Sequence, residues 1–164
     1  MLEWFPGRFL IEGDRNDYDY IYTREKLATL AGKKLHGKRN HIARFKDSGD
    51  WSYEPMTAEN VEECRTMTYT WIHMREEKWN EEMNQEISVL HEELGLVGGV
   101  LRRDGQIVAF SIGERLNSET FVVHFEKAYP DLQGAYPMIN QQFVLHECEG
   151  YAYVNREEDT GDPG

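Results

Sequence analysis

Two strand-like runs joined by an Asp-Gly pair constrain the fold of this chain most strongly. The runs cover 96–103 and 106–116, and Asp104-Gly105 between them is typical of a two-residue hairpin turn that needs positive φ. Residues 119–128 then indicate a third strand, in which Phe121, Val123 and Phe125 would face one side and Val122, His124 and Glu126 the other. The sequence therefore predicts an antiparallel meander of three strands.

Further strands and helices are expected around this meander. Strands are predicted at 18–23, 51–54 and 151–155, and helices at 26–31, 38–46, 57–74, 83–94 and 137–148. Thr23 and Thr57 are candidate N-caps for two of the helices. The order predicts an α/β fold with a mixed sheet, an α+β arrangement that matches the GCN5-related acyltransferase fold.

A weak internal sequence similarity bears on the domain organisation. Residues 20–25 and 151–157 both read as an aromatic strand that ends in Arg-Glu. We interpret this similarity as the sign of an incomplete tandem repeat of two related halves. Residues 1–50 would be a remnant of the first acyltransferase-like half, and 51–164 a second half lacking its last helix and strands.

The remaining composition bears on the compartment. No stretch approaches the ~20 apolar residues of a membrane span, and residues 1–6 lack the pattern of a signal peptide. Cys64 and Cys148 lie in helix-like stretches, where buried, reduced thiols are expected rather than a disulfide. These features predict a cytoplasmic protein.

Charge is distributed very unevenly along the chain. The formal net charge is −12, yet residues 24–46 hold eight Lys or Arg and one acid, so this segment carries +7 and the rest −19. Glycines and a helix start near Lys38 would add backbone N–H groups, which suits a phosphate cradle. Its candidate substrate-binding residues are Lys33, Lys34, His36, Lys38, Arg39 and Asn40. A solvated basic helix face is the alternative, and the segment is not a Walker loop.

A second candidate group lies in the third meander strand. With strict alternation, His124 and Glu126 face the same side of the sheet and could act as a catalytic acid–base pair. The alternative is a polar pair on a half-buried sheet.

Two further groups follow in the C-terminal part. Tyr136 and Asn140 are candidate substrate-binding residues at a helix start, where acetyl-CoA enzymes place a glycine-rich loop, although Gly134 alone represents it here. Adjacent polar residues near the end could bind an amino group or form a solvated tail: Asn155, Arg156, Glu157, Glu158 and Asp159. The histidines show no zinc spacing with the cysteines, so no structural metal is predicted.

These four groups of residues, in their order along the chain, resemble the phosphatidylglycerol lysyltransferase C-terminal family, including its stand-alone soluble bacterial members. The matching strings are Phe5-Pro6-Gly7-Arg8-Phe9, the run 20–42, the hairpin from Gly98-Gly99 to Gly113-Glu114, His124–Ala128, Gly134–Asn140 and Asn155–Gly161. The resemblance covers nearly the whole chain.

The resemblance implies a fold of two tandem GCN5-like halves. The lysyltransferase relatives transfer an aminoacyl group from charged tRNA to a lipid head group. Family members carry more chain before residue 5 and after Gly161, so this chain looks truncated at both ends. Missing strands would leave an open sheet edge, which predicts a homodimer formed by edge pairing or segment exchange.

We therefore expect an acyltransferase that takes an anionic donor such as aminoacyl-tRNA or acyl-CoA, and no bound cofactor. Lys33, Lys38 and Arg39 would hold donor phosphates, and Glu126 or His124 would accept a proton from an amine or hydroxyl acceptor. The acidic end would attract a cationic acceptor. A non-catalytic anion- or RNA-binding module and an inactive structural fragment remain alternatives.

Overall fold

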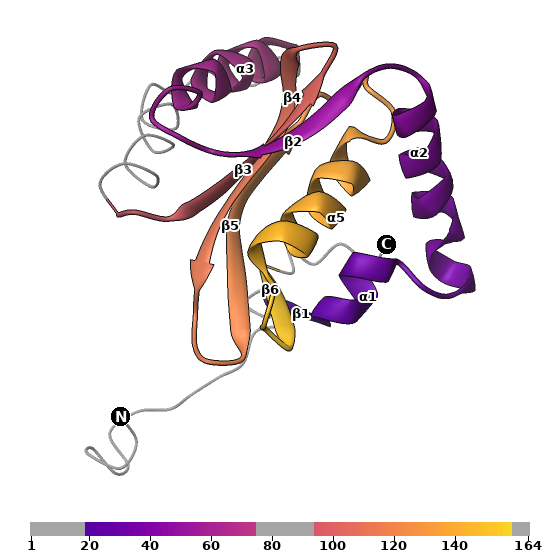
Figure 1. Cartoon of the computed structure of the whole chain (residues 1–164), viewed down its shortest axis with the longest axis vertical. Coiled ribbons are helices and arrows are strands. Elements are labelled where there is room, and N and C mark those ends of the chain that lie inside the picture. Colours follow the sequence, from indigo (N-terminus) through magenta and orange to yellow (C-terminus); the bar gives the residue numbers. More distant parts are fainter. Residues whose placement is uncertain (1–18, 75–93, 159–164) are drawn as a thin grey trace.

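One mixed sheet of six strands organises the chain (Figure 1). The computed structural model describes residues 19–74 and 94–158. The strand order is β1-β6-β5-β4-β3-β2, and every neighbouring pair is antiparallel except β5 and β6. The strands are β1 Asp19–Thr23, β2 Trp51–Pro55, β3 Val97–Arg103, β4 Gln106–Arg115, β5 Thr120–Ala128 and β6 Tyr153–Glu158.

The predicted meander is confirmed as β3, β4 and β5. Asp104 and Gly105 have φ of 49° and 81°, as a tight turn between twisted antiparallel strands requires. The predicted fold class, a mixed α/β fold, is confirmed with it. The helices are α1 Arg24–Thr29, the short 3-10 helix η2 Lys33–Leu35, α2 His36–Asp47, α3 Val61–Met74 and α5 Ala135–Glu147.

The helix starts follow the predictions in part. Thr23 caps α1, because its hydroxyl accepts a hydrogen bond from the Lys26 N–H. The helix predicted from Thr57 instead begins at Val61, since the Asn60 Oδ1 accepts the Thr57 N–H at 2.8 Å and forms a turn first. Most of the helix predicted at 83–94 lies outside the described residues.

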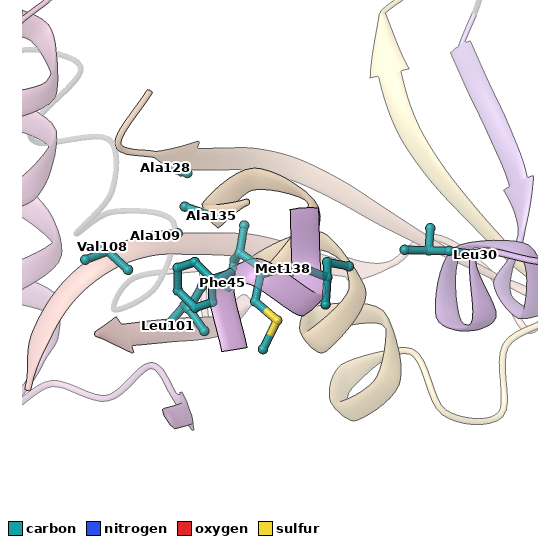
Figure 2. Packing of buried hydrophobic residues seen from close by; sticks show 10 residues of the cluster. Leu30, Phe45, Leu101, Val108, Ala109, Ala128, Ala135 and Met138 are labelled. Atoms are coloured by element: carbon teal, nitrogen blue, oxygen red, sulfur yellow. The ribbon is translucent and has the colours of Figure 1, made fainter. Parts of the chain in front are cut away.

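Helices cover both faces of the sheet. Figure 1 shows α1, α2 and α5 on one face and α3 on the other. On the first face, Phe45 of α2 and Met138 of α5 lie beside Leu101 of β3 (Figure 2). The thiols of Cys64 and Cys148 are free and buried, as predicted.

A β-bulge changes the alternation of β5. Ile112 is opposite Phe125, and Gly113 is opposite Val123, so His124 is an extra residue in β5. Val123 packs under α5, and Phe125 packs against the cluster under α3. The alternation predicted for this strand therefore holds up to Val123 and fails after it.

A second irregularity lies beside the first, in β6. Asp19 is opposite Glu158 and Ile21 is opposite Asn155, so β6 holds one more residue than β1 over this interval. Glu157 has φ of 48°, in the left-handed region that non-glycine residues rarely adopt. The parallel register of β5 and β6 extends only over 120–122 and 153–155.

The sheet joins both predicted halves of the chain. β1 lies within 1–50, and its partner β6 lies within 51–164. The division into two acyltransferase-like halves stays a prediction. In the described part of the chain, no helix combines the length and apolar character needed to cross a membrane.

Candidate functional site

A pocket of about 340 Å³ opens on the face covered by α1, α2 and α5. Four elements contribute to it, namely α2, α5, β5 and β6, together with Leu30, which directly follows α1. Its lining residues are Leu30, Lys38, His41, Glu126, Tyr136, Pro137, Asn140 and Arg156.

Glu126 supplies the carboxylate of this pocket. Its Oε2 accepts hydrogen bonds from the Ser111 hydroxyl at 2.9 Å and from the Asn140 amide at 3.4 Å. Its Oε1 forms an ion pair with the Arg156 guanidinium at 2.8 Å, and the Glu126 side chain is 9% exposed. A buried carboxylate is costly unless it is hydrogen-bonded and paired, and these three contacts supply both.

The bulge is what directs Glu126 into the pocket. Ser111 and Glu126 are opposite each other in the register of β4 and β5, on the face where α5 lies. Without the extra residue, Glu126 would follow the alternation of Val122 and point away from α5. Bulges commonly re-aim side chains beside binding sites.

The basic segment reaches the pocket through Lys38. The Arg39 side chain does not line the pocket. Its guanidinium donates instead to the backbone carbonyls of Leu30 and Gly32 and stabilises the turn after α1. Lys38 and Arg156 therefore bring two cations to a pocket that holds one carboxylate, which makes it suited to an anionic group.

A close helix contact shapes the same wall. Gly134, with φ of +90°, precedes α5, and a Cβ there would lie 2.4 Å from the His41 carbonyl oxygen of α2. Glycine is therefore required where α2 and α5 meet.

His124 lies outside the pocket. Its Nδ1 is 2.8 Å from Glu157 Oε1, and its Nε2 is 2.9 Å from Glu114 Oε1. Burial lowers the pKa of His124, but hydrogen bonds to the two carboxylates outweigh it, and the net pKa lies above 6.5. The prediction that His124 and Glu126 share a sheet face is wrong, because the bulge separates their contacts.

The structure brings five predicted site residues together in the pocket: Lys38, Glu126, Tyr136, Asn140 and Arg156. The others lie elsewhere. Exposed on η2 and α2 are Lys33, Lys34, His36 and Asn40. Asn155 is buried and donates to Asp19 Oδ2 at 2.7 Å. The Glu158 side chain and Asp159 lie outside the described part.

Sequence reasoning missed several residues of the site. Leu30, His41 and Pro137 line the pocket, and Ser111 supports Glu126. Ser111 carried a usable signal, since it is the one hydroxyl in the apolar run 107–112 and a buried hydroxyl needs a partner.

Comparisons with known proteins agree with this fold. A conserved protein of unknown function from Bacteroides thetaiotaomicron is 42% identical, with a TM-score of 0.85 over 99% of this chain and 57% of its own. L-PGS from Bacillus licheniformis is 19% identical, with a TM-score of 0.59 over 84% of this chain and 43% of its own, and this likeness concerns the fold.

A sequence relative gives the same picture. An uncharacterized protein from Mycoplasmoides gallisepticum is 25% identical over 179 residues, covering 98% of this chain and 54% of the relative. The chain thus spans about half the length of these three relatives. Residues 2–162 match the family described as phosphatidylglycerol lysyltransferase, C-terminal, and this chain belongs to that family.

Proposed function

We propose that this domain catalyses acyl transfer, moving an aminoacyl group from a charged tRNA to an amine or hydroxyl acceptor. The observation that carries the proposal is the Glu126 carboxylate, which lies in the same pocket as Lys38 from the basic helix α2. Family membership supports acyltransferase chemistry in general. Acyl-CoA is the other donor of the same charge class.

Glu126 has the hydrogen-bonding capacity of a general base. A carboxylate offers about four lone-pair positions. Its contacts among the described residues occupy three, from Ser111, Asn140 and Arg156, so one position on Oε1 is left for an acceptor proton. In the proposed step, the acceptor attacks the acyl carbonyl carbon and its proton passes to Glu126. The C–O bond to the donor breaks, the Lys38 ammonium stabilises charge on the departing oxygen, and that oxygen then takes the proton from Glu126 to leave as a hydroxyl.

The donor's phosphates have a surface beside the pocket. Lys33 and Lys34 on η2 are exposed next to the start of α2, where Lys38 lines the pocket. Such a row of cations suits a polyphosphate backbone better than a single small anion. Arg39 contributes less than predicted from the sequence, because its guanidinium is bonded to the α1–η2 turn.

The proposal is tested by following loss of labelled amino acid from bulk charged tRNA in the presence of small amine or hydroxyl acceptors. Glu126→Gln should lower kcat by about 10²-fold or more, the usual contribution of a general base. Lys38→Ala should raise KM for the tRNA. Arg44→Ala is the matched control, since Arg44 is exposed on the same helix and does not line the pocket. Unchanged transfer in Glu126→Gln would refute the assignment.

One observation favours a second function. The ion pair between Arg156 and Glu126 already neutralises the carboxylate, so the pocket could serve as a non-catalytic anion- or RNA-binding module. Binding of tRNA with a steep salt dependence, and no transfer from any charged tRNA or acyl-CoA, would support this alternative.

Homodimer formation and a cytoplasmic location belong to the same proposal. β1 is a terminal strand of the sheet, where Ile21 is 61% exposed, and Tyr153 of the neighbouring β6 is 42% exposed. An apolar terminal strand favours pairing with a second copy. Sedimentation should show a dimer for the native chain and a monomer for Ile21→Lys, and a native monomer would refute the dimer.

A further inference from the structure

A chain of polar contacts crosses four strands on the face opposite the pocket. Asp19 of β1 accepts a hydrogen bond from Asn155 of β6, whose Oδ1 accepts the Glu157 N–H at 2.8 Å. Glu157 bonds His124 of β5, and His124 bonds Glu114 of β4. The contacts run through both irregular positions, His124 in β5 and Glu157 in β6.

The end of β6 has a strained backbone, and these contacts support it together with the pairing of Glu158 opposite Asp19 of β1. A left-handed φ at a non-glycine residue is strained, and it persists when neighbouring contacts determine it. Glu157 has that φ, and both its backbone N–H and its carboxylate are engaged, by Asn155 and His124. The parallel backbone pairing of β5 and β6 has already ended at Val122 and Asn155, so side chains carry the connection.

The residue before Glu157 is the one that enters the pocket. Arg156 reaches Glu126 at 2.8 Å on the α5 face, while Glu157 reaches His124 on the other face. Arg156 Nε is buried and has no hydrogen-bond acceptor among the described residues. The position of the guanidinium therefore depends on the backbone at Glu157 and on the contact with Glu126.

We propose that His124 is a positioning residue, which fixes the end of β6 through Glu157 and thereby places Arg156 against Glu126 in the pocket. It does not act as the base, because both ring nitrogens contact carboxylates and the ring does not line the pocket. The inference rests on the proposed function only for its activity readout.

The structural part of the proposal is tested by NMR on the full chain. Within the described part of the chain, the ionisable groups that contact His124 are Glu114 and Glu157, so Glu114→Gln should lower the midpoint of the His124 ring titration. In His124→Gln, exchange of the buried Arg156 Nε proton should become about tenfold faster, because the end of β6 opens more often. Glu119→Gln, an exposed acid in the turn before β5, should change neither signal.

The kinetic part separates positioning from catalysis. In His124→Gln the pocket groups are present but misplaced, so kcat should fall by about tenfold and KM should change by less than about twofold. Loss of the base in Glu126→Gln should lower kcat far more. The wild-type rate should also fall as pH rises through the His124 pKa, and this limb should be absent in His124→Gln. In Glu114→Gln, His124 keeps its contact with Glu157, so kcat should lie between the values of the wild type and His124→Gln. This milder variant serves as a control for misfolding of His124→Gln.

The outcomes distinguish the two proposals. Unchanged Arg156 exchange in His124→Gln would overturn the positioning role even if the wild type is active. A drop in kcat as large as that of Glu126→Gln would overturn it as well, by making His124 catalytic. Absence of transfer in the wild type would refute the proposed function, while the titration and exchange measurements would still decide the role of His124.

Discussion

Replacing Gly134 with alanine should loosen the junction that forms one wall of the pocket. At φ of +90°, a Cβ costs about 1–2 kcal/mol from backbone sterics alone. The added Cβ would also lie 2.4 Å from the His41 carbonyl oxygen, and backbone cannot give way as a flexible side chain does. The two helices would have to separate by about 1 Å to restore ordinary contact, an overpacking cost of about 1–3 kcal/mol.

The total loss of unfolding free energy should therefore be about 2–5 kcal/mol, the sum of the two costs. For a chain of this size, this corresponds to a fall in Tm of about 4–20 °C. Thermal and urea unfolding, followed by circular dichroism, measure both quantities. Because His41 lines the pocket, tRNA binding should weaken as well.

Gly105→Ala is the matched control for this experiment. Gly105 has φ of +81°, but a Cβ there would meet no heavy atom within 4 Å. It should lose only the conformational part, about 1–2 kcal/mol. Equal losses in the two variants would refute the close-contact argument.

Three further outcomes are expected. Burial raises the pKa of the Cys64 and Cys148 thiols to about 12, so a thiol reagent should leave both unmodified in the folded chain at about pH 8 and label both after unfolding; rapid labelling of the native chain would contradict their burial. The raised pKa of His124 contributes stability that is fully present below its ordinary 6.5 and is lost as pH rises through its folded-state value, so the stability difference between wild type and His124→Gln should shrink as pH rises above 6.5 in urea titrations; a difference that grows with pH would show the opposite shift. Ser111→Ala should cost about 1.5–3 kcal/mol of unfolding free energy, because a buried hydroxyl bonded to the charged Glu126 is removed; a neutral effect would mean that water replaces it.

The elements that follow local rules were predictable from the sequence. The Asp104-Gly105 turn, the cap at Thr23 and the apolar periodicities identified the meander and most helices, because each depends on residues close in sequence. The bulge at His124 was missed because the apolar residues Phe121, Val123 and Phe125 recur at every second position, as in a regular strand. Gly113 carried the missing signal. A Cβ there would lie 2.2 Å from the Val122 carbonyl oxygen, and a glycine inside a strand often marks a bulge.

The candidate site was predictable only as a set of residue types. The sequence pointed to Lys38, Glu126 and Arg156 separately, but the Glu126–Arg156 pair depends on β5 and β6 being adjacent and parallel. Pairing of strands that are distant in sequence is a tertiary property. For the same reason the role of Arg39 could not be foreseen, because its carbonyl partners are presented by a left-handed turn at Leu30.

The pairing of β1 with β6 has a consequence for how the chain acquires its structure. Thr23 is opposite Tyr153, 130 residues further along, whereas β3, β4 and β5 follow one another through short turns. Contacts between near neighbours form early, and distant ones must first overcome loop-closure entropy. During synthesis, β1 therefore cannot pair with β6 until almost the whole described chain has emerged from the ribosome. The exposed apolar side chains of β1 are available to chaperones, or to another nascent chain, throughout that interval.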